Sequence, residues 1–361
     1  MPGIASRAIT GHHNALPGRE DLLMKAAIYQ GKHRFEVKDV PDPQPGPGQI
    51  QVRITYAGVC GTDVHGFQYD NVPPGTILGH EYAGVVSAVG KGVTRWRIGD
   101  RVVGGGGTPP PGGGHPAYFS PRFTFSKEGW KVSKPGAYAE KLLMEEWEPL
   151  PVPANVSDLE AALCEPAANA ARAVRRSGLR TGDSVAVLGA GPIGLFTLQV
   201  LKASGAGKVI VSEPSPARAA AAAKLGADAV IDPTKEDAVQ RIVALTDGNG
   251  PHIAFDCAAA PQSLQQALDC VRRNGRVVLI ALAWEPVSVF TVDWICREVE
   301  LVTTLGAQDE DFKATLGLIA SRKITMEPLV TDASIQPLDR IQTTFEELMK
   351  PRNRVQAVFK L

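Results

Sequence analysis

The sequence predicts a two-domain α/β protein in which a β-rich domain precedes a doubly wound parallel sheet. Its 361 residues suffice for about two domains of roughly 150 residues, each with its own core. From Lys25 to about Asp100 the sequence predicts a β-rich domain, with a clear period of two over residues 50–56. After about Glu165, short β-branched runs alternate with helical patterns, which is the order expected of a parallel sheet covered by helices.

The overall composition excludes several classes of protein. The 38 Lys and Arg residues balance 38 Asp and Glu residues, so no basic excess is present to hold nucleic acid. The five cysteines form no Cys-x-x-Cys pair, which argues against a disulfide framework. The first 23 residues lack the apolar core of a signal peptide. We therefore expect a cytoplasmic protein with neither a nucleic-acid nor a membrane partner.

The chain divides into four segments by its patterning. We expect an N-terminal tail at 1–23, a β-rich domain at 24–167, a dinucleotide-binding domain at 168–311, and a return to the first domain at 312–361. In the β-rich domain Ile50, Val52, Ile54 and Tyr56 alternate with polar residues, which predicts a half-buried strand. The stretch 104–136 is rich in Gly, Pro and aromatic residues and has no usable period.

The second domain is predicted from five short apolar runs separated by helical patterns. These runs are Ser184–Gly189, Lys208–Ser212, Ala229–Asp232, Ile253–Cys257 and Arg276–Ala281. The uncharged stretch Ser184–Leu201 is long enough to raise the question of a membrane span. Because glycines and a proline interrupt its middle, a strand, a turn and a helix explain it better.

A glycine-rich turn follows the first of these runs. It reads Gly189-Ala190-Gly191-Pro192-Ile193-Gly194, and an apolar helix is expected to follow it over Leu195–Lys202. In this G-x-G-x-x-G pattern the first glycine makes the turn, the second lets backbone amides approach a pyrophosphate, and the third packs helix on strand. The helix N-terminus then faces the phosphates with its N–H groups. The turn therefore predicts a dinucleotide site.

The residues that distinguish NAD from NADP follow the second apolar run, Lys208–Ser212. Glu213 follows the strand, about 20 residues after Gly194, where a carboxylate accepts ribose hydroxyls and repels a 2′-phosphate. Arg218 is a counter-signal because an arginine at this place can accommodate a 2′-phosphate. With Glu213 present, we expect Arg218 to lie on the adenine side and NAD to be the cofactor.

Three separated pieces of sequence carry residue types that bind zinc. Cys60 begins Cys60-Gly61-Thr62-Asp63-Val64-His65, His80 and Glu81 follow Gly79, and Glu165 stands between Cys164 and Pro166. A thiolate, an imidazole and a carboxylate with an open position define a catalytic zinc site. Any one of these residues alone is more simply explained as a packed core residue.

Together these motifs resemble the medium-chain, zinc-dependent alcohol dehydrogenase superfamily from about Met24 to the C-terminus. The matching segments include 58–65, 79–86, 99–103, 165–166 and 189–194. Glu165-Pro166 stands where alcohol dehydrogenases proper have a cysteine ligand, so the polyol and diol dehydrogenases (sorbitol, butanediol, threonine) are the subgroup that the chain resembles most. The resemblance implies a GroES-like catalytic domain, a Rossmann domain for NAD, and a homo-oligomer (dimer or tetramer).

The resemblance also implies roles for the zinc-binding residues. Cys60, His80 and Glu165 match the three zinc ligands of the family, while Glu81 is a ligand in some states or members. Asp63 matches a carboxylate that orients the zinc-bound histidine. Cys164 is expected to point away, on the other side of an extended segment.

The second, structural zinc of many members has no counterpart here. The stretch 104–136 holds no cysteine, and His115 is its only histidine. We therefore expect one catalytic zinc per chain and a lobe held by its aromatic residues.

The implied reaction interconverts a secondary alcohol (a polyol, a diol or a bulky cyclic alcohol) and its ketone with hydride transfer to or from NAD. In the family, the position of Thr62 hydrogen-bonds the substrate oxygen, and a proton passes through the nicotinamide ribose to the position of His65. Glu165 favours a polyol or diol, whereas the aromatic residues of 104–136 with Phe67 and Tyr69 favour a bulky cyclic secondary alcohol. Two alternatives stay open: a zinc-free, NADP-dependent quinone or enoyl reductase, and a non-catalytic NAD-binding protein.

Overall fold

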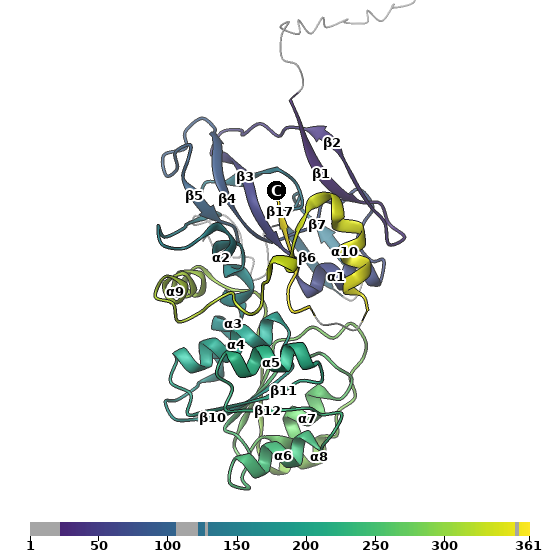
Figure 1. The fold of residues 1–361 in the computed structure, drawn as a ribbon, viewed down its shortest axis with the longest axis vertical. Helices are drawn as coiled ribbons and strands as arrows, with labels where there is room; N and C mark the ends of the chain where they lie inside the picture. The colour runs from purple at the N-terminus through teal and green to yellow at the C-terminus, as the bar shows by residue number, and fades with distance from the viewer. Residues whose placement is uncertain (1–21, 106–121, 127–128, 351–353) are drawn as a thin grey trace, which may run out of the picture.

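The computed structural model describes residues 22–105, 122–126, 129–350 and 354–361. Most of the predicted tail 1–23 and most of the stretch 104–136, His115 included, lie outside these residues. The described chain forms two domains, placed one above the other in Figure 1. A seven-stranded sheet builds the β-rich domain and a six-stranded parallel sheet builds the other.

The lower domain of Figure 1 is a doubly wound parallel sheet with the strand order β12-β11-β10-β13-β14-β15. Its strands are β10 (Ser184–Leu188), β11 (Lys208–Ser212), β12 (Ala229–Ile231), β13 (Ile253–Asp256), β14 (Arg276–Leu279) and β15 (Glu300–Thr303). Read from β10 as the first strand, this order is the 3-2-1-4-5-6 of the Rossmann fold. The run Ser184–Leu201 is thus a strand, a turn and a helix, and no helix among the described residues is long and apolar enough to cross a membrane.

Helices cover both faces of this sheet because its strands are apolar on both sides. Val185 and Val187 of β10 join one apolar cluster, while Ala186 and Leu188 join the cluster on the opposite face. The first face is covered by α3 (Cys164–Ser177), α4 (Pro192–Ala203), α5 (Pro216–Lys224) and α9 (Asp309–Ala320). The second face is covered by α6 (Ala238–Leu245), α7 (Ser263–Cys270) and α8 (Thr291–Cys296).

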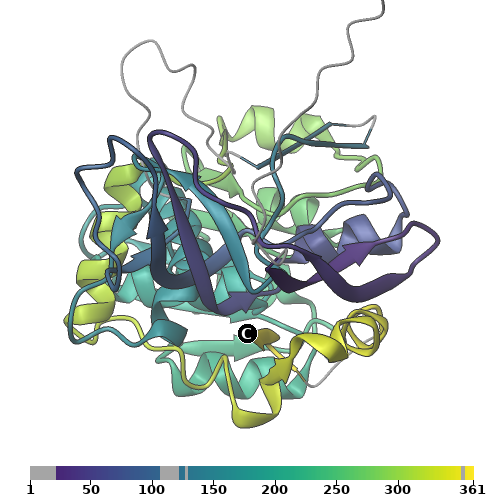
Figure 2. The ribbon, with the colours of Figure 1, turned by 90° about the horizontal axis from the view of Figure 1, so that it is seen from above.

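The upper domain is built around β3 (Gln49–Gly58), whose residues Ile50, Val52 and Ile54 are fully buried, as their alternation predicts. Gln51 is also buried, and its side-chain amide donates a hydrogen bond to Asp42. The other strands before the crossing are β1 (Leu23–Tyr29), β2 (Phe35–Pro41), β4 (Glu81–Val89), β5 (Arg101–Val103), β6 (Phe123–Ser126), β7 (Gly129–Val132), β8 (Lys141–Glu145) and β9 (Leu150–Pro151), with helices α1 (Gly61–Gln68) and α2 (Asp158–Ala162). Figure 2 shows the β1–β2 ribbon extending to one side of the main sheet.

The C-terminal part of the chain returns to the upper domain. It contains η1 (Asp332–Ser334), β16 (Ile335–Pro337), η2 (Leu338–Arg340), α10 (Ile341–Leu348) and β17 (Val358–Lys360). Strand β17 pairs antiparallel with β3, and the yellow β17 lies against the purple β3 in Figure 1. The expected boundaries at 167 and 311 fall inside α3 and α9.

The part of 104–136 that the structure describes contains a β-hairpin that the sequence did not predict, β6 paired with β7. Phe123 and Trp130 meet edge to face across it, with ring centroids 5.6 Å apart. Arg122, at its base, is 1% exposed and donates to the carbonyls of Pro135 (2.6 Å) and Leu143 (2.7 Å). Aromatic packing and a buried cation therefore both attach this hairpin to the sheet.

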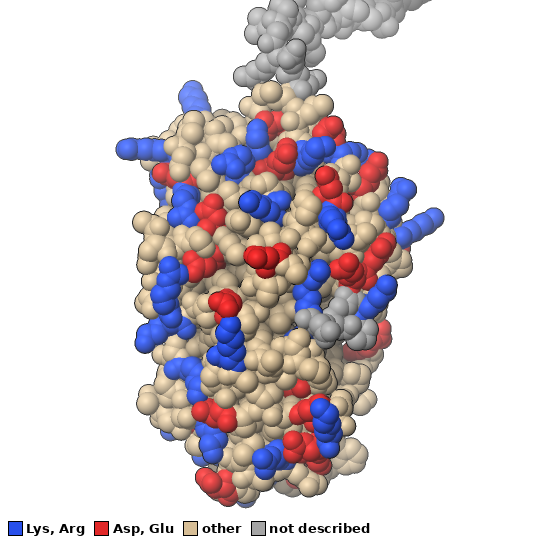
Figure 3. All heavy atoms as spheres, in the orientation of Figure 1, with Lys and Arg blue, Asp and Glu red and all other residues tan. Residues whose placement is uncertain are grey.

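Charges of both signs are interspersed on the face drawn in Figure 3. No extended area of a single sign dominates that face, in keeping with equal numbers of acidic and basic residues in the chain. This face therefore offers no electrostatic footprint for a nucleic acid.

Candidate active site

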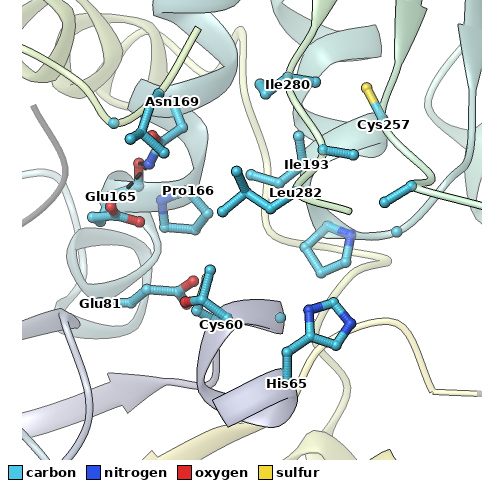
Figure 4. Close-up of a pocket in the computed structure, with 18 of the residues that line it drawn as sticks. Cys60, His65, Glu81, Glu165, Pro166, Asn169, Ile193, Cys257, Ile280 and Leu282 are labelled. Atoms are coloured by element: carbon cyan, nitrogen blue, oxygen red, sulfur yellow. Dashed lines mark hydrogen bonds between the residues drawn. The ribbon is translucent and has the colours of Figure 1, made fainter. Parts of the chain in front are cut away.

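A pocket with a cavity of about 210 Å³ lies between the two domains. Figure 4 shows it with side chains from both sides. The upper domain contributes residues around Cys60, His65 and Glu81, and the lower domain contributes the glycine-rich turn and the ends of β13, β14 and β15. Helix α3 contributes Glu165 and Asn169. The two motifs that the sequence placed far apart thus open into one space.

The predicted zinc-binding residues come together because β3 and β4 are neighbours. The register pairs Gly58, the last residue of β3, with Glu81, the first residue of β4. Cys60 follows β3 and His80 precedes β4, so both lie at the same end of the strand pair. A ligand atom from each of Cys60, His80 and Glu81 lies within 4.8 Å of the others. Figure 4 labels Cys60 and Glu81 on the same side of the pocket.

Asp63 and Tyr138 fix the orientation of His80. Nδ1 of His80 lies 3.5 Å from Oδ1 of Asp63, and the hydroxyl of Tyr138 donates to Oδ2 of Asp63 at 2.7 Å. All three side chains are buried. Burial lowers the pKa of His80, but the charges of Asp63 and Cys60 and their hydrogen bonds to the ring together outweigh it, so that the pKa lies well above its usual range. The contact with Nδ1 leaves Nε2 as the ring nitrogen available to a metal ion.

The carboxylate of Glu81 is buried beside other acidic groups. Burial and the nearby carboxylate of Glu165 raise the pKa of Glu81. Gln356, also buried, donates from Nε2 to Oε2 of Glu81 at 3.2 Å. A thiol, an imidazole and carboxylates grouped at this spacing match the donor set of a divalent zinc ion, whose charge would stabilise the ionised carboxylates. The residues therefore fit the metal that the motifs imply.

Glu165 lines the same pocket but lies outside the 4.8 Å cluster. It is buried at the start of α3, and Asn169, one turn later, donates from Nδ2 to Oε1 of Glu165 at 2.9 Å, the dashed line of Figure 4. Burial raises the pKa of Glu165 as well. Cys164 is the first residue of α3 and not part of an extended segment, so that expectation was wrong. Its Sγ is nevertheless turned away, 3.9 Å from the carbonyl oxygen of Phe312.

Thr62 and His65 lie on α1, immediately after Cys60. Oγ1 of Thr62 is buried, lines the pocket side of the helix, and has no hydrogen-bond partner among the described residues. The imidazole of His65 also lines the pocket, and burial lowers its pKa. The side chains of both residues are thus placed to meet a bound small molecule.

The glycine-rich turn has the geometry that the sequence pattern predicts. Gly189 has φ +95°, and a Cβ on Gly194 would lie 1.9 Å from the carbonyl oxygen of Gly189, so a side chain is excluded there. A Cβ on Gly191 would meet nothing within 4 Å, which leaves open space for a phosphate in front of α4. Helix α4 begins at Pro192, three residues earlier than expected, so Pro192, Ile193 and Gly194 form its first turn.

Glu213 is buried directly after β11, next to this turn. Its Oε2 accepts from the amide of Ala190 at 2.7 Å and its Oε1 accepts from the amide of Ser215 at 2.8 Å. Each oxygen retains a further lone pair for a ribose hydroxyl. Arg218 lies in the first turn of α5, and its buried Nε has no hydrogen-bond partner among the described residues.

Two residues suggested for an apolar substrate pocket do not line it. Phe67 is fully buried and stacks against Phe35 with ring centroids 5.5 Å apart, so it belongs to the core of the upper domain. Tyr69 is 43% exposed and lies outside the pocket lining. The helical period explains the error for Phe67, which lies two positions after His65 on α1 and so points to another face of the helix, into the core.

Four residues at the site were missed in the sequence: Tyr138, Asn169, Gln356 and Cys257. Asn169 was the most accessible of them, because it follows Glu165 by one helical turn in a segment that reads as a helix. Tyr138, Gln356 and Cys257 come from distant segments and carry no local pattern, so the sequence offers no comparable signal for them.

Comparisons with known proteins agree with this geometry. Residues 46–154 match the family model of the alcohol dehydrogenase GroES-like domain, and residues 192–321 match that of the zinc-binding dehydrogenases. A sorbitol dehydrogenase of Halalkalibacterium halodurans is 31% identical, with 85% of this chain and 92% of that protein covered. An L-threonine 3-dehydrogenase of Pyrococcus furiosus is 33% identical, with 93% and 98% covered. The crystal structure of 2R,3R-butanediol dehydrogenase from Bacillus subtilis superposes with a TM-score of 0.82 at 28% identity, covering 94% of this chain and 99% of that one.

Proposed function

Because the chain belongs to the medium-chain, zinc-dependent alcohol dehydrogenase superfamily, in the subgroup of the polyol and diol dehydrogenases, we propose that it interconverts a secondary alcohol and its ketone with NAD and one zinc ion. The observation that carries this proposal is the cluster of Cys60, His80 and Glu81 in the pocket onto which the dinucleotide turn opens. The donor set argues against a zinc-free reductase, because such an enzyme needs no metal ligands. Thr62 and His65 beside the cluster argue against a non-catalytic NAD-binding protein, because these side chains are suited to proton transfer.

We propose that zinc is held by Cys60, His80, Glu81 and Glu165. The first three already lie within 4.8 Å of one another, and Glu165 faces them across the pocket. When bound, the zinc ion supplies a Lewis acid for the substrate oxygen and the nicotinamide supplies a hydride acceptor. One zinc per chain is proposed, because the stretch 104–136 contains no cysteine for a second site.

The protein's own groups orient the substrate and take up its proton. Oγ1 of Thr62, buried and otherwise unpartnered among the described residues, is the group proposed to hydrogen-bond the substrate hydroxyl. His65 is proposed to accept the proton at the edge of the pocket, since burial keeps its imidazole neutral to a lower pH than usual. Asp63 holds His80 in the orientation that a metal ligand needs and does not itself meet the substrate.

We favour a polyol or vicinal diol over a bulky cyclic alcohol as the substrate. Thr62, Glu165 and Asn169 line the pocket and offer polar atoms for more than one hydroxyl group. Phe67 and Tyr69, which supported an apolar pocket, lie elsewhere. The similar proteins whose names specify a substrate include those for sorbitol and threonine.

NAD is proposed over NADP because the carboxylate of Glu213 lies next to the turn that would hold the pyrophosphate. A second negative charge on the adenosine ribose would meet that carboxylate in a buried setting. Arg218, whose buried Nε has no described partner, is proposed to lie on the adenine side.

We also propose a homo-oligomer, with at least a dimer formed through the lower domain. Strand β15 is the terminal strand of its sheet, so its outer edge has no pairing partner among the described residues. Next to it, Phe290, Val292 and Ile295 are 77%, 64% and 63% exposed. A second copy of this chain would cover both the edge and these side chains.

The cytoplasm is proposed as the location, since all five cysteines are unpaired thiols.

The proposal is tested by metal content and by NAD reduction with 2,3-butanediol, sorbitol, threonine and a cyclic terpenoid alcohol. We expect about one zinc per chain, turnover with a diol or polyol, and loss of both zinc and turnover in Cys60→Ser. Cys257→Ser is the matched control, because this thiol lines the same pocket outside the metal cluster. Zinc-free protein that reduces quinones or enoyl compounds with NADPH would overturn the proposal, and so would zinc-loaded protein that turns over none of the alcohols.

A further inference from the structure

The imidazole of His65 is held by ring contacts and not by hydrogen bonds. His65 lines the pocket, and no side-chain hydrogen bond or ion pair joins it to any residue that the structure describes. Its ring instead meets two aromatic rings, that of Tyr69 at 6.2 Å and that of Trp284 at 6.1 Å between centroids. The rings of Tyr69 and Trp284 are therefore the aromatic neighbours of the imidazole.

The two aromatic partners come from different domains. Tyr69 is the residue that follows α1, the helix of the upper domain that carries His65. Trp284 lies between β14 and α8 of the lower domain, two residues beyond Leu282, which lines the pocket. Trp284 also contacts Tyr69, with centroids 6.5 Å apart, so the three rings form one cluster that joins the domains beside the pocket.

The contact between His65 and Trp284 has a favourable geometry for two aromatic rings. The ring planes of His65 and Trp284 are inclined at 63°, which is an edge-to-face arrangement. Such pairs have a preferred geometry because the ring edge is positive and the ring face is negative. Since the cluster has a member on each domain, the position of the imidazole depends on how the domains meet.

We propose that Trp284 is a positioning residue of the lower domain that holds the imidazole of His65 in place at the pocket. The proposal rests on the proton-accepting role proposed for His65, but the contact itself does not depend on that role. Burial is the cause of the lowered pKa of His65, and Trp284 is one of the groups that bury it. Among the described residues that contact its ring, Tyr69 is the ionisable one, and burial is the cause of the shift.

The first test follows His65 by NMR in protein without metal, cofactor or substrate. The imidazole resonance is assigned by its absence in His65→Gln, and its titration is compared in wild type, Trp284→Ala and Trp284→Phe. We expect the midpoint to move to higher pH in Trp284→Ala, because the ring becomes more exposed, and to stay near that of wild type in Trp284→Phe. Trp294→Ala is the matched control, since Trp294 lies on α8 of the same domain and has no ring contact with His65.

The second test is the pH profile of turnover. In Trp284→Ala we expect kcat to fall about two- to tenfold, mostly below neutral pH, with KM for NAD little changed. An unmoved His65 midpoint in Trp284→Ala, or a Trp284→Phe that behaves like Trp284→Ala, would overturn the proposal. A shifted midpoint together with a normal pH profile in His65→Gln would keep the contact and refute the proton-accepting role instead.

Discussion

Gln356 hydrogen-bonds the carboxylate of Glu81, with Nε2 3.2 Å from Oε2, although the two residues are 275 positions apart in the chain. The same Nε2 lies 3.4 Å from the carbonyl oxygen of Val59, next to Cys60. Glu81 belongs to the cluster of possible metal ligands, and Val59 precedes Cys60, which also belongs to it. The C-terminal return of the chain therefore builds part of the site that the N-terminal motifs predict.

Replacement of Gln356 by Leu is expected to weaken zinc binding about tenfold, because Glu81 loses the donor that orients it. The dissociation constant is measured by competition with a chelator. Gln336→Leu serves as the control, since Gln336 hydrogen-bonds only the carbonyl of Ala333, away from the cluster. Equal zinc affinities in the two variants would mean that Glu81 keeps its orientation without Gln356.

Replacement of His65 by Gln is expected to change the pH dependence of turnover. Burial lowers the pKa of His65, so the neutral, proton-accepting form is present above that pKa and is lost as the pH falls through it. The variant should lack this acidic limb, should turn over roughly 10- to 100-fold more slowly near neutral pH, and should be partly rescued by an added base such as imidazole. A variant with the wild-type profile and no rescue would remove His65 from proton transfer.

Replacement of Glu213 by Ser is expected to reverse part of the cofactor preference. A charge-assisted hydrogen bond contributes roughly 1.5–3 kcal/mol, so wild type should favour NAD over NADP by at least about tenfold in kcat/KM. The variant should bind NAD more weakly and NADP better, because Arg218 remains as a partner for a phosphate. Adding Arg218→Ala should cancel the gain for NADP. Wild-type protein that prefers NADP would contradict the assignment of Glu213.

Replacement of Arg122 by Met is expected to lower the free energy of unfolding by about 3 kcal/mol, since it leaves the buried Glu148 without its guanidinium. Arg122 and Glu148 are both almost fully buried, 3.5 Å apart, and Lys134 lies 2.5 Å from the same carboxylate. Urea unfolding of the metal-free protein measures the change. Arg95→Met is the control, because Arg95 only covers the ring of Trp96. A loss of stability no larger than in the control would show that Lys134 alone neutralises Glu148.

Replacement of Ile295 by Lys is expected to weaken self-association through β15 and α8. Ile295 is 63% exposed, and a cation in the centre of an apolar contact loses its hydration. The molar mass is measured by sedimentation at several concentrations. Ile98→Lys is the control, since Ile98 is 68% exposed on the other domain. Monomeric wild-type protein at every concentration would contradict the proposed dimer.

The sequence by itself determined the features that depend on neighbouring residues. The Gly189–Gly194 turn, the burial of alternate residues in β3 and the alternation of strands and helices all follow local periods, because backbone sterics and burial of one face act over a few residues. The family was also predicted from the sequence, because several spaced motifs together resemble those of the zinc-dependent alcohol dehydrogenases. Boundaries were less accurate, as the start of α4 at Pro192 shows, because proline stabilises the first turn of a helix before the apolar pattern begins.

Only the tertiary structure decided which side chains support the site. Tyr138 reaches Asp63, Gln356 reaches Glu81 and Trp284 reaches His65 across long separations in the chain. Phe67 turned out to be core, and the ligand atoms of Glu81 lie within 4.8 Å of those of Cys60 and His80, whereas Glu165 lies outside that distance. These outcomes depend on the register of β3 with β4, the return of β17 and the meeting of the two domains. Such contacts are selected by packing among distant segments, which leaves no local pattern in the sequence.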